Sequence, residues 1–156
     1  MDQRNSPITE VVNSEAIKNY KMQQQINFDE KVLETFNEIK MKSAHQYMIC
    51  TINKDGDKLE LESIGAKDSD FETMAKALPD KEGRFIVFDY PKKYEDGRCA
   101  SKLTFIFWCP SGVPIKRRLV YSSNKSGVKA KLDCPCNINC HDRSDIELEE
   151  VDKNIK

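Results

Sequence analysis

The sequence predicts an α/β fold in which a central, mixed five-stranded sheet is covered by helices on both faces. Two segments, 83–91 (GRFIVFDYP) and 102–110 (KLTFIFWCP), are almost wholly apolar, as is typical of strands buried on both faces. Around them, apolar residues recur at helical spacing, and the elements follow one another in the order αββαββαβα. The last strand comes after a helix, so it can return parallel to its neighbour through a crossover.

The length of 156 residues suits one domain with a single core, which we assign to residues 26–156. Residues 1–25 are polar and rich in Asn, Gln and Ser, and we expect an N-terminal extension that is flexible or a marginal helix. No window approaches the roughly 18 apolar residues of a membrane span, and the first residues lack the apolar core of a signal peptide. We therefore expect a cytoplasmic protein, or one shared between cytoplasm and nucleus.

The first predicted helix lies within residues 26–43 (INFDEKVLETFNEIKMKS). Asn27 and Glu30 have the spacing of a capping box, which indicates that the helix begins just after Asn27. The following apolar residues share one helix face, namely Val32, Leu33, Phe36 and Ile39.

A hairpin and a short helix are expected next. The segments 45–53 (HQYMICTIN) and 58–66 (KLELESIGA) flank an Asp-Gly dipeptide that suits a type I′ turn. In residues 68–80 (DSDFETMAKALPD), apolar side chains return at helical spacing, and Pro79 ends the helix.

The second half of the chain begins with the two central strands. The polar segment 92–101 (KKYEDGRCAS) joins them and contains another Asp-Gly dipeptide, so a long hairpin is expected. After Pro114 the sequence predicts a helix to about residue 132, a short strand at 136–141 (CNINCH) and a closing helix at 144–155 (SDIELEEVDKNI).

The helix after Pro114 is where the charge of the chain is most uneven. The formal net charge is −1, but residues 97–132 contain eight Lys or Arg side chains and no acid. Lys116, Arg117 and Arg118 stand in the first helical turn, where a cation opposes the helix dipole at a cost of about 0.3–1 kcal/mol each. This placement indicates that a partner outside the helix uses these cations.

The apolar residues of the same helix form a stripe that can be buried against the sheet, made up of Tyr121, Val128 and Leu132. Leu119 falls outside this stripe and is expected to be exposed among the cations. An exposed aliphatic residue within a basic patch indicates a protein-docking surface. The alternative interpretations are an ordinary solvated helix face and a binder of nucleic acid or anionic membranes.

The segment 102–125, KLTFIFWCPSGVPIKRRLVYSSNK, resembles the signature of the actin-depolymerising factor (ADF)/cofilin family. The likeness extends over about residues 25–155, through INFDEKVLETFNEIK, RFIVFDY and CHDRSDIELEEV. It implies the ADF-homology fold and a long helix that inserts between two subdomains of an actin monomer. The monomer-binding residues that it implies are Ile26, Asn27, Phe28, Asp29, Lys116, Arg118, Leu119 and Lys125.

The resemblance implies two further sets of contacts. Filament sides would meet Arg98, Lys102, Glu147, Glu149 and Glu150, and phosphoinositide head groups would meet Lys116, Arg117, Arg118, Lys125 and Lys129. Many relatives carry a basic residue where this chain has Ala100, so filament binding is expected to be weaker than monomer binding.

We therefore expect a monomeric, non-enzymatic protein that binds actin monomers and filaments and promotes filament disassembly, by depolymerisation and weak severing. One alternative is a relative that acts on filament sides or branched-filament machinery without severing, and another is an anionic-lipid or nucleic-acid binder. No nucleic-acid partner, cofactor or metal is expected. The cysteines and histidine of residues 134–141 lack the spacing of zinc knuckles, and the six cysteines are expected to be free thiols.

Overall fold

The computed structural model describes residues 26–156, and the extension predicted for residues 1–25 lies outside the described residues. The elements, in chain order, are β1 (Asn27–Phe28), α2 (Glu30–Lys42), β2 (Tyr47–Ile52), β3 (Lys58–Gly65), α3 (Phe71–Lys76), β4 (Arg84–Lys93), β5 (Cys99–Trp108), α4 (Ile115–Lys131), β6 (Cys136–Cys140), the 3-10 turn η1 (Arg143–Ile146) and α5 (Leu148–Asn154).

The strands form one mixed sheet in the order β1-β3-β2-β4-β5-β6. The outer pairs β1–β3 and β5–β6 are parallel, and the inner pairs are antiparallel. The parallel return of the last strand is therefore confirmed. The described sheet has six strands instead of the predicted five, because the two residues of β1 pair with Lys58 and Leu59. A two-residue strand is too short to show an alternating pattern in the sequence.

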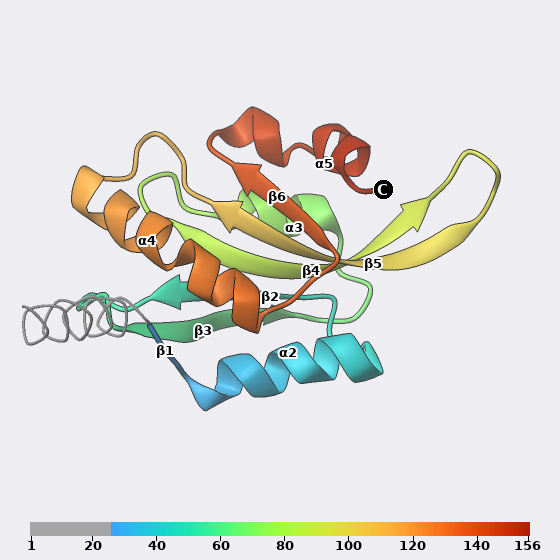
Figure 1. Cartoon of the computed structure of the whole chain (residues 1–156). Helices are drawn as coiled ribbons and strands as arrows, with labels where there is room; N and C mark the ends of the chain where they lie inside the picture. The colour runs from blue at the N-terminus through green and yellow to red at the C-terminus, as the bar shows by residue number, and fades with distance from the viewer. Residues whose placement is uncertain (1–25) are drawn as a thin grey trace, which may run out of the picture.

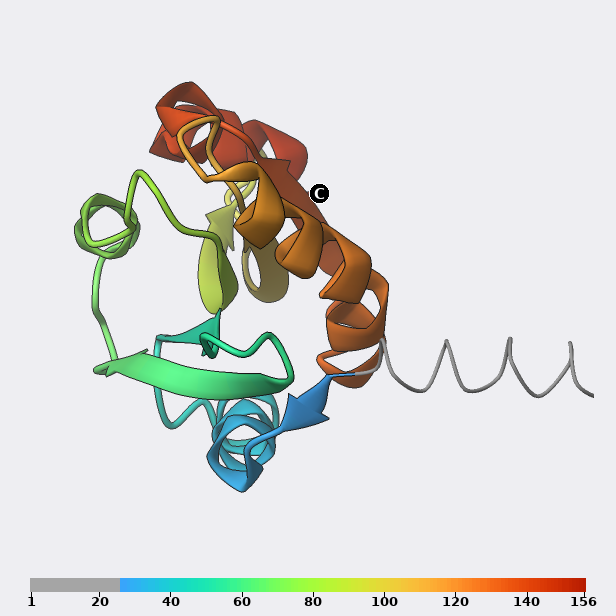
Figure 2. The same ribbon diagram turned by 90° about the vertical axis from the view of Figure 1, so that its left-hand side faces the viewer.

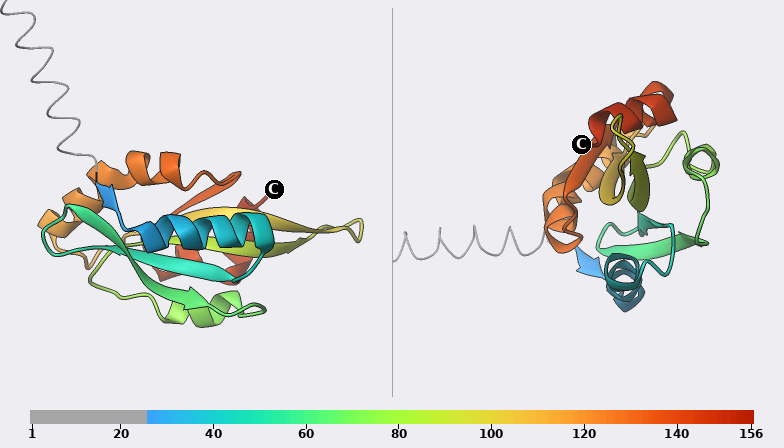
Figure 3. Two further views of the ribbon diagram at one scale, coloured as in Figure 1. Left: turned by 90° about the horizontal axis from the view of Figure 1, so that it is seen from below. Right: turned by 90° about the vertical axis from the view of Figure 1, so that its right-hand side faces the viewer.

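Helices cover both faces of the sheet, as predicted (Figures 1 and 2). Helices α2 and α4 pack on one face, where Phe85 and Phe105 belong to the core, and α3 and α5 pack on the other, around Phe88 and Ile106. The alternating side chains of β4 and β5 thus enter two separate cores, which explains why these strands read as continuous apolar runs. Their hairpin projects beyond the rest of the sheet (Figure 3).

Three local predictions were wrong in detail. The α2 N-cap is Asp29, whose side chain accepts a hydrogen bond from the Lys31 amide, because Asn27 is paired in β1. In the β2–β3 turn Gly56 has a positive φ of 77° but Asp55 does not, whereas a type I′ turn requires both. The closing helix is interrupted: η1 ends at Ile146, Glu147 is extended, and α5 begins at Leu148.

Candidate protein-docking site on helix α4

Helix α4 is fixed to the sheet by its apolar stripe. Tyr121, Val128 and Leu132 have no exposed surface, which confirms the predicted buried face. The hydroxyl of Tyr121 accepts a hydrogen bond from the Ile52 amide at 3.1 Å, so the helix is also tied to the end of β2. Gly83 permits this close packing, because a Cβ atom there would come within 2.7 Å of the Tyr121 ring.

Two large apolar side chains remain exposed at the start of α4. Leu119 is 63% exposed, as predicted, and Ile115, one helical turn earlier, is 74% exposed. Sequence reasoning missed Ile115, although its spacing of four residues from Leu119 places both on one face of the helix. Large apolar side chains exposed together on a helix end are typical of an interaction surface.

The two cations beside this apolar pair, Lys116 and Arg118, differ in their contacts with the rest of the protein. None of the ion pairs within residues 26–156 involves Lys116, which is exposed. Arg118 is exposed but donates to the carbonyl oxygens of Ser111 at 2.8 Å and Val113 at 3.3 Å, and these bonds hold the loop before the helix. Among residues 26–156, the first turn therefore presents one ammonium group without an ion-pair partner and one guanidinium that is only partly occupied.

Two cations further along the helix, Lys125 and Lys129, also differ in their exposure and contacts. Lys125 is half-buried, and its Nζ atom lies 5.3 Å from the centroid of the Phe107 ring. Lys129, one turn later, is exposed. Arg118, Lys125 and Lys129 lie within about 40° of one another around the helix axis and make one side of α4 basic, whereas Lys116 projects from a different side.

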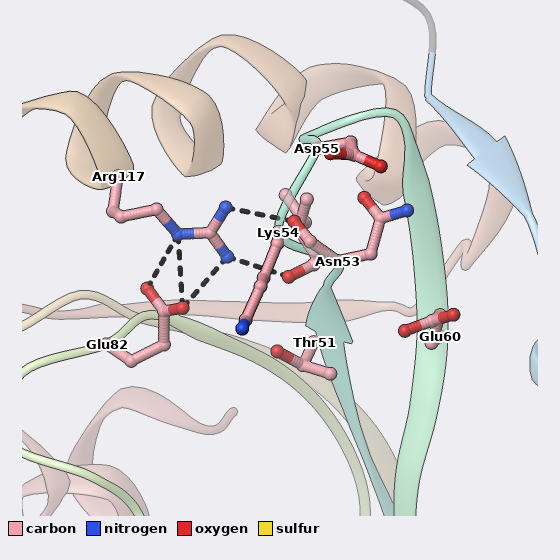
Figure 4. Close-up of a pocket in the computed structure, with 8 residues that line it drawn as sticks. Thr51, Asn53, Lys54, Asp55, Glu60, Glu82 and Arg117 are labelled. Carbon is pink, nitrogen blue, oxygen red and sulfur yellow. Dashed lines mark hydrogen bonds and ion pairs between the residues drawn. The ribbon is translucent and has the colours of Figure 1, made fainter.

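Arg117 points away from this surface and into a depression of about 580 Å³ between α4, the end of β2 and the loop before β4 (Figure 4). Its guanidinium forms an ion pair with Glu82, with an NH2–Oε2 distance of 2.8 Å. Hydrogen bonds to Glu82 raise the pKa of Arg117 further above its ordinary value. The structure thus gives an intramolecular partner to this predicted phosphoinositide contact.

The predicted contacts before α2 are not equally accessible. Ile26 is 8% exposed and belongs to the same core as Val128, so its side chain faces the protein interior. Asn27 is exposed, and Phe28 is half-buried. Asp29 caps α2 and lies 3.9 Å from Lys58.

The residues predicted to meet filament sides lie on the β4–β5 hairpin and at the start of α5. Arg98, near the hairpin tip, is exposed and pairs with Asp96 at 2.7 Å, and Lys102 is half-buried. Glu147 and Glu149 are exposed, and Glu150 lies 3.4 Å from Lys153.

A hydrogen-bonded network connects the hairpin to α5. The hydroxyl of Tyr90 donates to Asp152 at 2.7 Å, and the ammonium of Lys92 donates to the same carboxylate at 3.0 Å. These bonds lower the pKa of Asp152, because they stabilise its ionised form. The network gives the two parts of the predicted filament surface a fixed relation to each other.

The cysteine-rich segment after α4 contributes thiols to the core. Cys134 and Cys140 are buried, which raises the pKa of each thiol to about 12. Within residues 26–156, no group of three or more His, Cys, Asp or Glu side chains is arranged to hold a metal ion. In the same part of the chain, every helix is too short or too polar to cross a membrane.

The sequence and the fold that carry this exposed start of α4 are similar to those of known proteins. Residues 25–156 match the model of a family described as cofilin/tropomyosin-type actin-binding protein. The chain belongs to this actin-binding family. Actophorin from Acanthamoeba castellanii is 32% identical over 100 residues, which cover 64% of this chain and 72% of actophorin.

Solved structures with the same architecture include a cofilin and a glia maturation factor. The crystal structure of Streptomyces griseoflavus cofilin matches with a TM-score of 0.72 and 27% identity, covering 81% of this chain and 93% of that one. Glia maturation factor from Caenorhabditis elegans matches with a TM-score of 0.68 and 21% identity, covering 84% and 96%. At 21% identity, the likeness to glia maturation factor shows only that the fold is shared.

Proposed function

We propose that this protein binds actin monomers and filaments in the cytoplasm and promotes filament disassembly, by depolymerisation and with weak severing. The observation that carries the proposal is the start of α4, where the apolar side chains of Ile115 and Leu119 are exposed beside Lys116 and Arg118. Family membership supplies the class of partner. This combination fits a helix that docks into an apolar groove with an acidic rim.

The cations and the apolar pair have different roles in this docking. Lys116 and Arg118 accelerate encounter with the acidic cleft and orient the helix, because exposed charges act mainly on association and specificity. Leu119 and Ile115 supply much of the affinity when the partner covers them. Disassembly then requires no covalent chemistry: a protein that binds one state of the filament more tightly increases the population of that state.

Filament contacts extend this surface to the β4–β5 hairpin and α5. Ala100 leaves Arg98 and Lys102 as the nearest cations on its own side of the hairpin, and Arg98 is already paired with Asp96. On the β4 side, Lys92 lies opposite Ala100 but is held by Asp152, and Lys93 is exposed. We therefore place monomer binding above filament binding in strength. The small number of free cations on the β4–β5 hairpin also favours a second candidate function. In this alternative, the protein acts on filament sides or branched-filament machinery without severing.

Anionic lipid head groups are a further ligand of the same helix in this proposal. Lys116, Arg118, Lys125 and Lys129 would attract them, whereas Arg117 is held by Glu82. Each cation near an anionic membrane surface contributes about 1 kcal/mol, so lipid and actin would compete.

Co-purification with monomeric actin at physiological salt tests the proposal. The double variant Lys116→Ala/Arg118→Ala should lose binding, while its circular dichroism and melting temperature stay close to wild type, since both side chains are exposed. The matched control is Lys67→Ala/Lys76→Ala, which removes the same charge from exposed positions outside α4 and should bind normally. Equal binding by all three proteins would refute the assignment of α4.

A further inference from the structure

The first turn of α4 lacks the features that usually stabilise a helix start. Pro114 occupies the N-cap position and makes no side-chain cap hydrogen bond, and no acidic residue stands in the first turn. Three consecutive cations occupy that turn instead, and each opposes the helix dipole. A turn of this composition would fray unless contacts from elsewhere in the molecule hold it.

Arg117 makes those contacts. Its Nε atom donates to the Glu82 carboxylate at 3.1 and 3.2 Å, and its NH2 group donates to Glu82 Oε2 at 2.8 Å. NH2 also donates to the Ile52 carbonyl at 2.7 Å, and NH1 donates to the Asn53 carbonyl at 2.9 Å. Four of the five N–H groups of the guanidinium are therefore used, which leaves Arg117 unable to bind a phosphate in a bidentate manner.

These bonds join three segments that are distant in the sequence (Figure 4). Arg117 comes from α4, Glu82 from the loop before β4, and Ile52 and Asn53 from the end of β2. The turn between β2 and β3, which begins at Asn53, also packs on α4, since a Cβ atom at Gly56 would lie 3.5 Å from a Val120 methyl group. The side chains of Arg117 and Glu82 are only 22% and 27% exposed, so water screens this ion pair less than one on the open surface.

We propose that Arg117 is a positioning residue, which locks the first turn of α4 to the β2–β3 turn and to Glu82 and so presents Lys116, Arg118 and Leu119 to actin. This inference rests on the proposed function and adds a residue that does not touch the partner. The ion pair substitutes for the missing helix cap. Without it, the first turn must be ordered at the moment of binding, which lowers the fraction of binding-competent molecules.

Glu82→Gln separates this positioning role from a direct charge contact with actin, because the two roles predict opposite changes in the affinity for actin. If Arg117 attracted actin, removing Glu82 would free its charge, make the protein more positive and tighten binding. If Arg117 positions the helix, Glu82→Gln weakens binding although the net charge becomes more favourable. Arg117→Lys makes the same distinction, since it keeps the charge but cannot reach Glu82 and two carbonyl groups at once.

The experiment measures the dissociation constant for monomeric actin together with hydrogen exchange of the free protein. Arg117→Gln, Arg117→Lys and Glu82→Gln should each bind about tenfold more weakly, as expected when about a tenth of the molecules remain competent. The hydrogen-bonded amides of Gly56 and Asp57 in the β2–β3 turn and of Arg118 in the first turn of α4 should exchange faster in all three. Val128→Ala is the control, because it creates a cavity in the buried half of the same helix and lowers the melting temperature without touching the first turn.

The outcomes decide between the alternatives. Unchanged affinity in the Arg117 variants with a lowered melting temperature, as in Val128→Ala, would make Arg117 merely structural and overturn the proposal. Tighter binding by Glu82→Gln, or wild-type binding by Arg117→Lys, would identify a direct charge contact and overturn it as well. If wild type itself does not bind actin, the proposed function and the docking role fail together, and the exchange data then show separately whether Arg117 orders the turn.

Discussion

Replacement of Leu119 by Ala tests the apolar part of the docking surface, and its effect can be worked out from exposure. Full burial of a leucine side chain contributes about 1.5–3 kcal/mol. Leu119 is 63% exposed in the free protein, so a partner can remove about two-thirds of that surface from water, worth about 1–2 kcal/mol. Leu119→Ala should therefore weaken monomer binding by about 5- to 30-fold.

The assay is fluorescence titration of labelled actin monomers at two salt concentrations. The ratio of affinities between Leu119→Ala and wild type should be the same at both, because apolar burial is not screened by salt. Met41, at the end of α2, is 75% exposed, and Met41→Ala is the matched control with no expected loss. An unchanged affinity for Leu119→Ala, or an equal loss for Met41→Ala, would refute the assignment of Leu119 as the anchor.

Three further predictions concern stability and the filament surface. Tyr121→Phe should lower the free energy of unfolding by about 1–3 kcal/mol in urea titrations, because it leaves the buried Ile52 amide without its acceptor. The pKa of Asp152 is lowered in the folded state, so its contribution to stability is present above its unfolded value of about 4 and is lost as pH falls through the lower folded value. Asp152→Asn should accordingly flatten the fall in stability below about pH 4, measured by denaturation at several pH values. Ala100→Lys should strengthen co-sedimentation with filaments while leaving monomer affinity unchanged, since it adds a cation to the hairpin alone.

Much of the fold was accessible from local patterns. The apolar runs of β4 and β5 are visible because both faces of each strand are buried, and the stripe of Tyr121 and Val128 repeats at helical spacing. Leu119 was identified by its absence from that stripe. Each of these signals is a periodicity, which a single element carries within its own sequence.

The features that the sequence did not show depend on contacts between distant segments. Arg117 and Glu82 are 35 residues apart, and neither lies in a sequence pattern from which the other could be predicted as its partner. Ile26 reads as one residue of an accessible segment, but pairing of β1 with β3 turns its side chain into the core. Asn27 and Asp29 are both good caps by residue type, and only that strand pairing decides between them.

Seeded filament disassembly watched by fluorescence microscopy tests the central claim most directly, since it follows filament ends and breaks at once. Wild-type protein should shorten filaments faster than actin alone, mostly from the ends and with few breaks. The Lys116→Ala/Leu119→Ala variant, altered at two exposed positions of α4, should leave the filaments as they are without protein. Equal acceleration by both proteins, or none by wild type, would contradict the account.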